Sequence, residues 1–440
     1  MKALKIGVLI SSLVICTLSG VSCGRSEEKG KVKYLNFKPE VAGVWEEVAQ
    51  LYTEKTGIEV EIVNSPSNSN DQTLQSEIAK REAPTLFQIN GPVGFSNWKY
   101  YCEDLSNTDL YSWVIDKDMV IKGEDGGVYG IPYVVEGYGI IYNDAIMQKY
   151  FNLNNRATTY KSVDEINNYE KLKAVVEDMT AHKEELGIKG VFASTSFAAG
   201  EEWRWQTHLM NVPVYYEYKE KGVDDLEELE FSYGENYKNV FDLYLNNSVI
   251  DKEDVASKTV GDSMSEFARG ECAMVQNGNW GWTQIASTEG NVISEEDCKF
   301  LPIYSGVEGE ENQGICTGTE SYICVNCDAS EADKKASIEF LEWLFSSEEG
   351  KDYVQNKFEF ITVFNTFSED EAPKNPLAKE VVSYMNDESK YSVTWNFTTF
   401  PSQNFKDQLS NKLYSYIKGE SEFSTVEEYV VYEWQLEKAQ

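Results

Sequence analysis

The strongest constraint on the fold is an alternation of strand and helix patterns early in the chain. Val32–Phe37 and residues 58–63 are strand-like, and residues 44–57 between them place apolar side chains at helical spacing and end at a glycine. A second helical stretch, about 71–81, leads into a further strand at Thr85–Ile89. This order predicts a parallel sheet with crossover helices, which is an α/β fold.

A polar segment follows each of the three predicted strands. These segments comprise residues 38–40, 64–70 and 90–92. Because the carboxyl ends of parallel strands meet at one edge of the sheet, ligands of α/β proteins bind beyond that edge. We therefore expect the three segments to surround a single cleft.

The rest of the chain is mostly helical and contains fewer strand patterns. A strand-like stretch covers 128–144, and Val163–Glu185 is the clearest later helix. Cys272–Gln276 and Tyr322–Val325 are further strands, and we expect Asp328 to cap the long helix that follows them.

The chain crosses between two groups of elements near 137–143 and 316–322, and neither stretch has the composition of a linker. Two lobes that share discontinuous segments, with a hinge and a cleft between them, are therefore expected. The predicted first lobe comprises 32–140 and about 321–370, and the predicted second lobe comprises 141–320 and about 371–440.

The first 23 residues have the pattern of a secretory signal. Lys2 and Lys5 form a basic start, residues 6–22 carry no charge, and small residues stand directly before Cys23. This order resembles a bacterial lipobox, in which the cysteine is acylated and the chain is cut before it, although Gly20 stands where leucine is usual.

An uncleaved membrane-spanning helix is the alternative interpretation of this segment. The uncharged run is at the short limit of the ~17–25 residues that a spanning helix needs, and serine and threonine dilute it. Small residues also crowd the end where a spanning helix places large apolar side chains. We therefore expect a signal peptide over 1–22 and a lipid-anchored tether over 23–31, on the extracellular face of the bacterial membrane.

The formal net charge of −35 argues against nucleic acid as a partner. Affinity for nucleic acid comes largely from Lys and Arg on phosphates, so a chain this acidic is repelled. We expect most of the carboxylates to face water on a soluble surface. The ordinary hydrophobic content of 41% indicates globular domains rather than disorder.

The cysteines and histidines argue against a metal site. Cys324 and Cys327 have CxxC spacing, but a zinc site needs a second pair of ligands, and His182 and His208 lack metal-motif spacing. We expect no metal and no cofactor, and we expect most cysteines to act as small buried hydrophobes. Several disulfide pairings are open to the six cysteines after Cys23, which are Cys102, Cys272, Cys298, Cys316, Cys324 and Cys327.

Four stretches, in order along the chain, carry a resemblance to a known family. They are an opening strand–helix–strand, a polar run before an apolar strand ending in Tyr-Asn, an Ala-Met strand before Asn-Gly-x-Trp-x-Trp, and a late helix with a Trp-Leu-x-Ser-x-Glu-x-Gly tail. Together they resemble the extracellular solute-binding proteins of sugar ABC importers, of the maltose-binding-protein type. The stretches cover residues 31–63, 126–144, 266–282 and 336–354.

This resemblance implies a periplasmic-binding-protein-like fold, in which two α/β lobes close on a sugar or oligosaccharide. It also implies that the closed protein docks on the permease subunits of an ABC transporter, which imports the cargo. A lipid anchor suits a cell with no outer membrane to retain a free protein. The expected protein is therefore a monomeric, membrane-anchored carrier and not an enzyme.

A sugar site needs aromatic planes for the apolar face of the ring and carboxylates or amides for its hydroxyls. The Asn-Gly-x-Trp motif places Trp280, with Asn279 beside it, where the family contacts its ligand; core filling is the alternative role of Trp280. Glu136 matches the family's acid at the first crossing, and Lys38 and Glu40 match the polar loop after the first strand. Exposed surface charge is the alternative role of these three residues.

The resemblance implies ligand contacts at other positions as well. Asn90 follows the third strand, where the family supplies a polar or aromatic ligand. Glu202 and Trp203 approximate the carboxylate and aromatic contribution of the second lobe. Glu320 lies near the second crossing, and Trp395 stands where a late aromatic often closes the site.

Two rival functions stay open on sequence alone. An anchored glycoside hydrolase could use Glu136, Glu201 or Glu202, because hydrolysis needs an acid and a second carboxylate ~5–9.5 Å apart. The same fold could instead bind iron, a polyamine or a peptide, although the Asn-Gly-x-Trp stretch favours a sugar. No nucleophile elbow, P-loop or zinc-protease motif supports another enzyme class.

Overall fold

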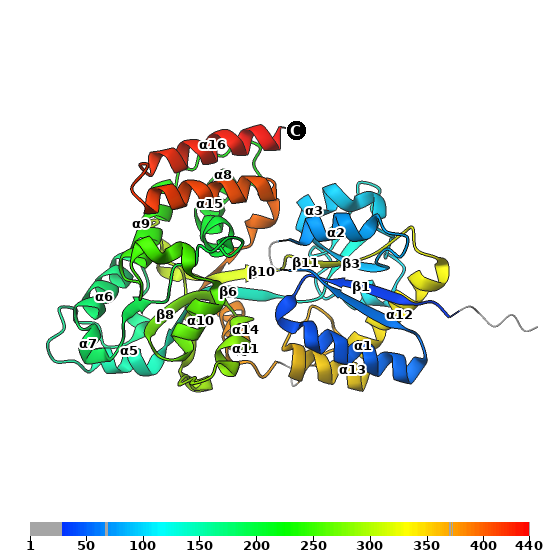
Figure 1. Cartoon of the computed structure of the whole chain (residues 1–440), viewed down its shortest axis with the longest axis horizontal. Coiled ribbons are helices and arrows are strands. Elements are labelled where there is room, and N and C mark those ends of the chain that lie inside the picture. Colours follow the sequence, from blue (N-terminus) through cyan, green and yellow to red (C-terminus); the bar gives the residue numbers. More distant parts are fainter. Residues whose placement is uncertain (1–28, 67–68, 369–370, 372, 440) are drawn as a thin grey trace, which may run out of the picture.

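The computed structural model shows two α/β lobes side by side, each built on its own sheet (Figure 1). It describes residues 29–439 except 67–68, 369–370 and 372. The predicted α/β fold with two lobes is confirmed. The predicted signal peptide, Cys23 and most of the tether 23–31 lie outside the described residues.

The first lobe is built on a mixed six-stranded sheet in the order β2-β1-β3-β11-β5-β4. Strand β1 pairs in parallel with β2 and β3, as predicted, whereas β11 lies antiparallel between β3 and β5. Strand β11 comes from much later in the chain and joins the two earlier parts of the sheet. The strands are β1 (Val32–Asn36), β2 (Val60–Asn64), β3 (Leu86–Asn90), β4 (Ile121–Lys122), β5 (Val128–Pro132) and β11 (Ser321–Val325).

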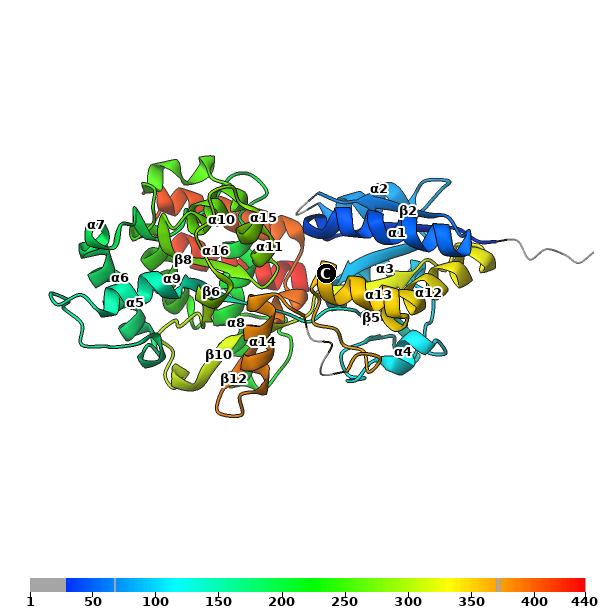
Figure 2. The ribbon, with the colours of Figure 1, turned by 90° about the horizontal axis from the view of Figure 1, so that it is seen from below.

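Helix α1 (Ala42–Thr56) forms where apolar residues repeat at helical spacing, and it buries Trp45, Val48 and Tyr52. It ends at Gly57, whose φ of +70° is the left-handed conformation that glycine adopts most readily. Helices α1 and α12 lie on the first sheet, and α13 packs against both of them (Figure 2). The other helices of this lobe are α2 (Asn70–Ile78), α3 (Gly91–Trp98), α4 (Asp109–Trp113), α12 (Glu331–Ser346) and α13 (Glu348–Tyr353).

The predicted cap of α12 is wrong, because Ser330 and not Asp328 caps this helix. The Ser330 hydroxyl accepts a hydrogen bond from the backbone N–H of Asp333 (3.1 Å). Asp328 lies in a turn instead, where its backbone N–H donates to Asn326 Oδ1 (3.0 Å). The turn made by Asn326 therefore delays the start of the helix.

The second lobe is built on a sheet in the order β12-β10-β6-β8-β7, with β9 also paired to β6. Strand β6 is buried along its whole length, and after Glu136 it contains no charged residue. These properties suit a central strand that is covered on both faces. The strands are β6 (Glu136–Asn143), β7 (Gly190–Phe192), β8 (Cys272–Gly278), β9 (Cys298–Leu301), β10 (Gln313–Gly318) and β12 (Tyr391–Thr394).

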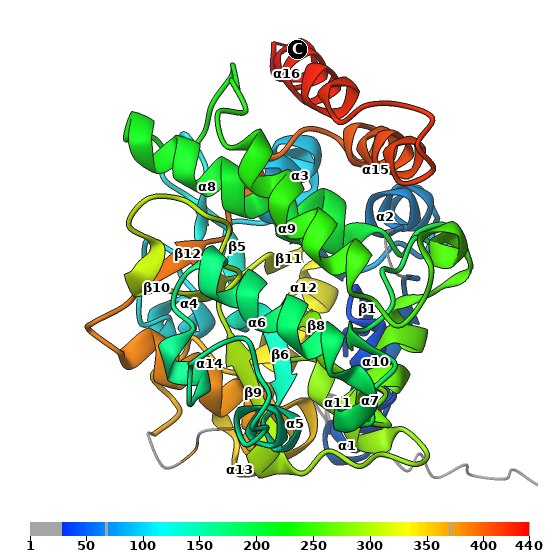
Figure 3. The same ribbon diagram turned by 90° about the vertical axis from the view of Figure 1, so that its left-hand side faces the viewer.

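Most helices of the described residues belong to the second lobe, and α15 and α16 pack together at its outer edge (Figures 1 and 3). No helix among the described residues is long and apolar enough to cross a membrane. The helices are α5 (Asp144–Phe151), α6 (Tyr169–Ala181), α7 (Lys183–Leu186), the π-helical turn η4 (Arg204–Leu209), α8 (Met210–Lys221), α9 (Gly234–Asn246), α10 (Val260–Ala268), α11 (Gly281–Ser287), α14 (Pro376–Asn386), α15 (Gln403–Ile417) and α16 (Ser424–Lys438).

The prediction of one continuous helix over Val163–Glu185 is wrong. Its first residues form a short 3-10 turn, and α6 begins only at Tyr169, after the side chain of Asn168 caps the helix. The Glu310 carboxylate accepts a hydrogen bond from the backbone N–H of Tyr169 (2.6 Å). A contact with a distant loop, which the local pattern does not contain, therefore fixes the start of α6.

The chain passes between the two sheets from β5 to β6, from β10 to β11, and between α13 and α14. The predicted crossings at 137–143 and 316–322 lie close to the first two passages. Strand β6, however, belongs to the second sheet from Glu136 onward. The predicted first-lobe segment 32–140 thus extends into that sheet, and the lobe boundaries stay a prediction.

All six cysteines of the described residues are free thiols, and all except Cys327 are buried. Burial raises the pKa of the Cys316 thiol to about 12, so this thiol stays protonated at neutral pH. Buried protonated thiols pack as small apolar side chains.

Candidate functional site

A cavity of about 410 Å³ lies between the two lobes. The first lobe contributes the loops after β1 and β3, and the second lobe contributes α10, α11, α15 and residues around η4. The edge where the first three strands end is thus one wall of the cavity, as predicted. The lining residues are Phe37, Lys38, Pro39, Glu40, Asn70, Asn90, Glu136, Glu201, Trp203, Thr207, His208, Val260, Gly261, Trp280, Gln284, Glu320, Ser321, Gln403 and Lys406.

A larger hollow of about 590 Å³ lies on the first lobe alone, beside α13. Its charged side chains are exposed or half-exposed, and two of them, Lys351 and Glu371, form an ion pair (2.7 Å). A hollow on one lobe cannot use lobe movement to enclose a ligand. The cavity between the lobes is therefore the candidate site.

A buried ion pair joins the first lobe to the crossing strand β6. Lys38 Nζ donates to both carboxylate oxygens of Glu136 (2.8 Å each), and the two residues are only 7% and 3% exposed. Lys38 follows β1, where the side chain of Asn36 accepts from the Lys38 backbone N–H (3.0 Å) and donates to its carbonyl (2.9 Å). The amide of Asn36 therefore holds the loop that carries the ammonium group.

The electrostatics of this cluster favour a charged Lys38. Burial by itself lowers the pKa of Lys38, but attraction from Glu136 and Glu40 outweighs burial and raises it. Glu40 lies 3.8 Å from Lys38 Nζ. Burial raises the pKa of Glu40, and the nearby ammonium group of Lys38 offsets only part of this rise.

Two further charged residues, Glu320 and Lys406, line the cavity. Glu320 lies in the link between β10 and β11, and Lys406 lies on α15 of the second lobe. Burial raises the pKa of the Glu320 carboxyl and lowers the pKa of the Lys406 ammonium group. Both groups are thus partly removed from water before any ligand is bound.

Aromatic rings form a wall of the cavity on the side of the second lobe. The half-buried ring of Trp280 lies 6.4 Å from Trp203 and 5.6 Å from His208, measured between ring centroids. Trp395 is buried and packs edge-on against Trp280 (6.3 Å, 87°). A Cβ at Gly278 would lie 2.1 Å from the Trp280 ring, so glycine is required for the ring to fold back over the end of β8.

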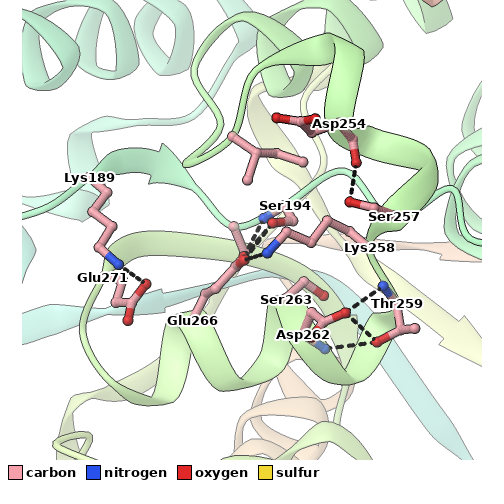
Figure 4. Close-up of polar contacts among 12 residues, drawn as sticks. Lys189, Ser194, Asp254, Ser257, Lys258, Thr259, Asp262, Ser263, Glu266 and Glu271 are labelled. Atoms are coloured by element: carbon pink, nitrogen blue, oxygen red, sulfur yellow. Dashed lines mark hydrogen bonds and ion pairs between the residues drawn. The ribbon is translucent and has the colours of Figure 1, made fainter.

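The N-terminus of α10 is a rigid part of this wall. Val260 lines the cavity, and its backbone N–H donates to Glu201 Oε2 (3.1 Å). Further along the helix, the Glu266 carboxylate accepts from the Ser194 backbone N–H (2.8 Å) and from Lys258 Nζ (3.0 Å), as Figure 4 shows. These contacts tie α10 to the segment that follows β7.

The cavity brings together most of the side chains that the sequence predicted as ligand contacts. Those that line it are Lys38, Glu40, Asn90, Glu136, Trp203, Trp280 and Glu320.

Three predicted contacts do not line the cavity. Asn279 is buried near the start of β6, where its Oδ1 accepts from the Gly137 backbone N–H (2.9 Å) and its carbonyl accepts from Asn375 Nδ2 (3.0 Å). Trp395 packs behind Trp280, and Glu202 precedes η4. Their role as ligand contacts stays a prediction.

Sequence reasoning missed several lining residues, among them His208, Gln403 and Lys406. Gln403 and Lys406 stand three residues apart on α15, so both project from one face of the helix. That spacing is visible in the sequence, but which face meets the cavity depends on tertiary packing. His208 drew attention only as a possible metal ligand.

The arrangement suits recognition by hydrogen bonds and ring stacking. Both lobes offer ammonium donors and carboxylate acceptors, and the second lobe adds aromatic faces. Among the described residues, no group of three or more His, Cys, Asp or Glu side chains could hold a metal ion.

Solved structures with the same fold include three whose names give a sugar, all at low sequence identity. A chitin oligosaccharide-binding protein is 14% identical with a TM-score of 0.73, and the match covers 94% of this chain and all (100%) of that one. RafE in complex with raffinose is 16% identical, with a TM-score of 0.66 and coverage of 93% and 99%. Maltose-bound MalE3 of T. maritima is 15% identical, with a TM-score of 0.63 and coverage of 92% and 99%.

No curated relative matches the chain significantly. The family model of bacterial extracellular solute-binding proteins, however, matches residues 47–408, which include both sheets except β1 and the cavity lining except Phe37, Lys38, Pro39 and Glu40. The two lobes, the cavity between them and this match agree with one another. The chain belongs to the bacterial extracellular solute-binding protein family.

Proposed function

We propose that the chain binds a sugar or an oligosaccharide in the cavity between its lobes. The observation that carries this proposal is that aromatic side chains, Trp203 and Trp280, and buried hydrogen-bonding groups such as Lys38 and Glu136 line the same cavity. Aromatic faces suit the apolar face of a pyranose, and carboxylates accept from its vicinal hydroxyls. The similar structures named for chitin oligosaccharide, raffinose and maltose support the same class of ligand.

Each lining group has a role in this proposal. Trp280 and Trp203 stack on the sugar ring. Glu40 and Glu320, whose pKa values are raised by burial, accept hydrogen bonds from hydroxyls, and these bonds offset the cost of their burial. Asn90, at the end of β3, adds an amide from the first lobe. Both lobes therefore contact the ligand.

A thermal-shift panel tests the proposal. The probes are maltotriose, raffinose, stachyose and chitotetraose, with glycerol as a control for bulk hydroxyl effects. A ligand at one hundred times its Kd stabilises the folded state by about 2.7 kcal/mol, which is a clear rise in melting temperature. Calorimetry on each positive sugar then gives the affinity. If no sugar in a wider panel raises the melting temperature, the proposal is wrong.

The proposal includes binding without cleavage. A hydrolase needs one carboxyl that donates a proton and a second that is free to act on the sugar or on water. Glu136 is engaged by Lys38 through both of its oxygens, which leaves it poorly placed for either role. An oligosaccharide incubated with the protein should be recovered intact by chromatography. Product sugars that accumulate with time would favour the hydrolase.

We also propose that ligand binding closes the lobes. A sugar that touches Asn90 on one lobe and Trp280 on the other makes its full contacts only in the closed state, so it binds that state better. Small-angle scattering should show a smaller radius of gyration with a saturating cognate sugar, while far-ultraviolet dichroism stays constant. An unchanged radius with bound ligand would indicate a preformed pocket instead.

The remaining part of the proposal is location and delivery. The lipobox-like sequence before Cys23 and the extracellular character of the family support a lipid-anchored protein outside the cell membrane. From there a monomer would pass its sugar to the permease subunits of an ABC importer. The substitution of Cys23 described in the Discussion tests the anchor.

A further inference from the structure

The imidazole of His208 lies in the wall of the cavity, although the residue is only 5% exposed. His208 belongs to the π-helical turn η4, which leads into α8. A π-helical turn displaces side chains from their regular helical positions, and such turns occur frequently at functional sites. Thr207, the preceding residue, lines the same cavity.

Aromatic rings from separate parts of the chain fix the orientation of this imidazole. The Tyr138 ring stacks on it at 4.1 Å between centroids with 7° between the planes. Trp203 and Trp280 meet it edge to face, at 4.9 Å and 5.6 Å. The Tyr138 hydroxyl also donates to the His208 carbonyl (3.0 Å), so both the ring and the backbone of His208 are held by β6.

The two ring nitrogens have different surroundings. Nδ1 is buried and has no hydrogen-bond partner among the described residues. Because the ring lines the cavity, Nε2 is the nitrogen left to meet a ligand. A neutral imidazole carries one proton, on either Nδ1 or Nε2. With the proton on Nε2, its only N–H donor faces the cavity and not the buried site at Nδ1, where the described residues offer no acceptor.

The surroundings keep this imidazole neutral. Burial and then the guanidinium group of Arg204 lower the pKa of His208 to about 3. The charged residues that line the same cavity are Lys38, Glu40, Glu136, Glu201, Glu320 and Lys406. His208 is thus a neutral ring with one donor, set among aromatic faces in a cavity that ammonium and carboxylate groups also line.

We propose that His208 determines specificity at the sugar site by donating a hydrogen bond from Nε2 to an oxygen of a ring stacked on the aromatic wall. This inference rests on the proposed function. A neutral donor held within an aromatic wall can reach a hydroxyl or ring oxygen at the edge of a stacked sugar. A phenyl ring at the same place has no N–H group and offers that oxygen only a weak contact. A sugar without an oxygen at that place leaves the donor unpaired and binds more weakly.

Two substitutions separate hydrogen bonding from ring packing. His208→Phe keeps a ring in the stack and removes the donor, whereas His208→Gln keeps a donor and loses the ring. With the best sugar of the panel of maltotriose, raffinose, stachyose and chitotetraose, we expect His208→Phe to lose at least about tenfold in affinity by calorimetry. We expect His208→Gln to bind that sugar more tightly than His208→Phe does. Binding by His208→Phe within twofold of the wild type would overturn the inference.

A spectroscopic measurement on the wild type does not depend on the stability of a variant. The chain has only two histidines, and the pKa of the other, His182, is raised above its usual value by its contacts with Asp178. In nitrogen-detected NMR, one imidazole should titrate near neutral pH and disappear from the titration in His182→Gln. The His208 ring should stay neutral to at least pH 4.5, and its Nε2–H signal should shift when the sugar binds.

The outcomes are distinguishable. A His208 ring that titrates near its ordinary pKa, or an Nε2–H signal unmoved by bound sugar, would overturn the inference while leaving sugar binding intact. A wild type that binds no sugar would overturn the proposed function and this inference with it.

Discussion

Replacing Gly91 by alanine should hold the two lobes apart. Gly91 begins α3 in the first lobe with a φ of +63°, and it packs against Thr398 of the 3-10 turn η10 (Asn396–Thr399) in the second lobe. The side chain of Asn211 fixes η10 by accepting from the backbone N–H of Asn396 (2.6 Å). This contact is therefore a rigid meeting point of the lobes, next to Asn90 of the cavity.

Two separate effects determine how much Gly91→Ala lowers the stability of the protein and its affinity for the ligand. A residue with a Cβ in the left-handed conformation destabilises the folded protein by about 1–2 kcal/mol, and this cost is the same whether the lobes are open or closed. In addition, a Cβ at Gly91 would lie 2.6 Å from Thr398 Cβ, so one side must move. Overpacking of this kind costs about 1–3 kcal/mol, and separation of the lobes relieves it. The second cost therefore falls on the closed state, and it corresponds to a loss of about 5- to 150-fold in ligand affinity.

Gly126→Ala is the matched control, because Gly126 has a φ of +83° and a Cβ there would meet no heavy atom within 4 Å. Urea unfolding should show a similar backbone cost of about 1–2 kcal/mol in both variants. Calorimetry with the cognate sugar should show wild-type affinity for Gly126→Ala and the predicted loss for Gly91→Ala. Adding Thr398→Gly to Gly91→Ala should restore most of the affinity.

Equal affinities for Gly91→Ala and Gly126→Ala would refute this reasoning, as would a double variant that binds no better than Gly91→Ala alone. Either result would mean that the lobes do not meet at Gly91 when the ligand is bound.

Further perturbations test the cavity, the ion pair and the anchor. Trp280→Ala should lose at least about fivefold in sugar affinity without unfolding, and unchanged calorimetry would argue against stacking. Lys38→Met should destabilise the ligand-free protein by about 3–5 kcal/mol, measured by urea unfolding, because it leaves the Glu136 carboxylate buried and unpaired. Adding Glu136→Gln should recover part of the lost stability. If the effects of the two substitutions on stability simply add, the pairing is contradicted. Since the pKa of buried His208 is lowered to about 3, the unfolded chain takes up a proton below pH 6.5 that the folded chain does not. Between pH 7 and pH 5 the wild type should therefore lose about 2 kcal/mol more stability than His208→Phe, and parallel curves would count against a buried neutral ring. Cys23→Ala should release the protein from membranes or leave it unprocessed, whereas equal membrane retention after signal cleavage would exclude the lipid anchor.

The first lobe is the part of the fold that the sequence predicts best. Residues of α1 show helical spacing and end at a glycine, and β1 and β2 on either side are apolar or alternating, so local patterns and final structure agree. The wrong predictions concern helix starts that contacts with residues outside the local pattern determine. Glu310 fixes the start of α6, and the turn at Asn326 moves the cap of α12 to Ser330. Neither contact leaves a signal in the local pattern.

The residues of the candidate site likewise fall into those that local sequence patterns predict and those that depend on tertiary packing. Lys38 and Asn90 could be anticipated because they follow parallel strands, whose ends meet at one edge of a sheet. His208 and Lys406 lie on helical segments, and spacing alone does not show which helix face meets the cavity. Asn279 stands beside Trp280 in the sequence, yet its side chain accepts a hydrogen bond from the backbone N–H of Gly137 in β6.

The position of β11 has a consequence for how the chain folds. Strands β3 and β5 both pair with β11 and not with each other, so the first sheet is divided in two until residues 321–325 arrive. During synthesis the N-terminus is made first. The whole central helical region must therefore be synthesised before β11 is available to complete the N-terminal sheet. Such long-range pairing slows folding and leaves strand edges exposed meanwhile. We expect the first lobe, cut off before β11, to remain unfolded.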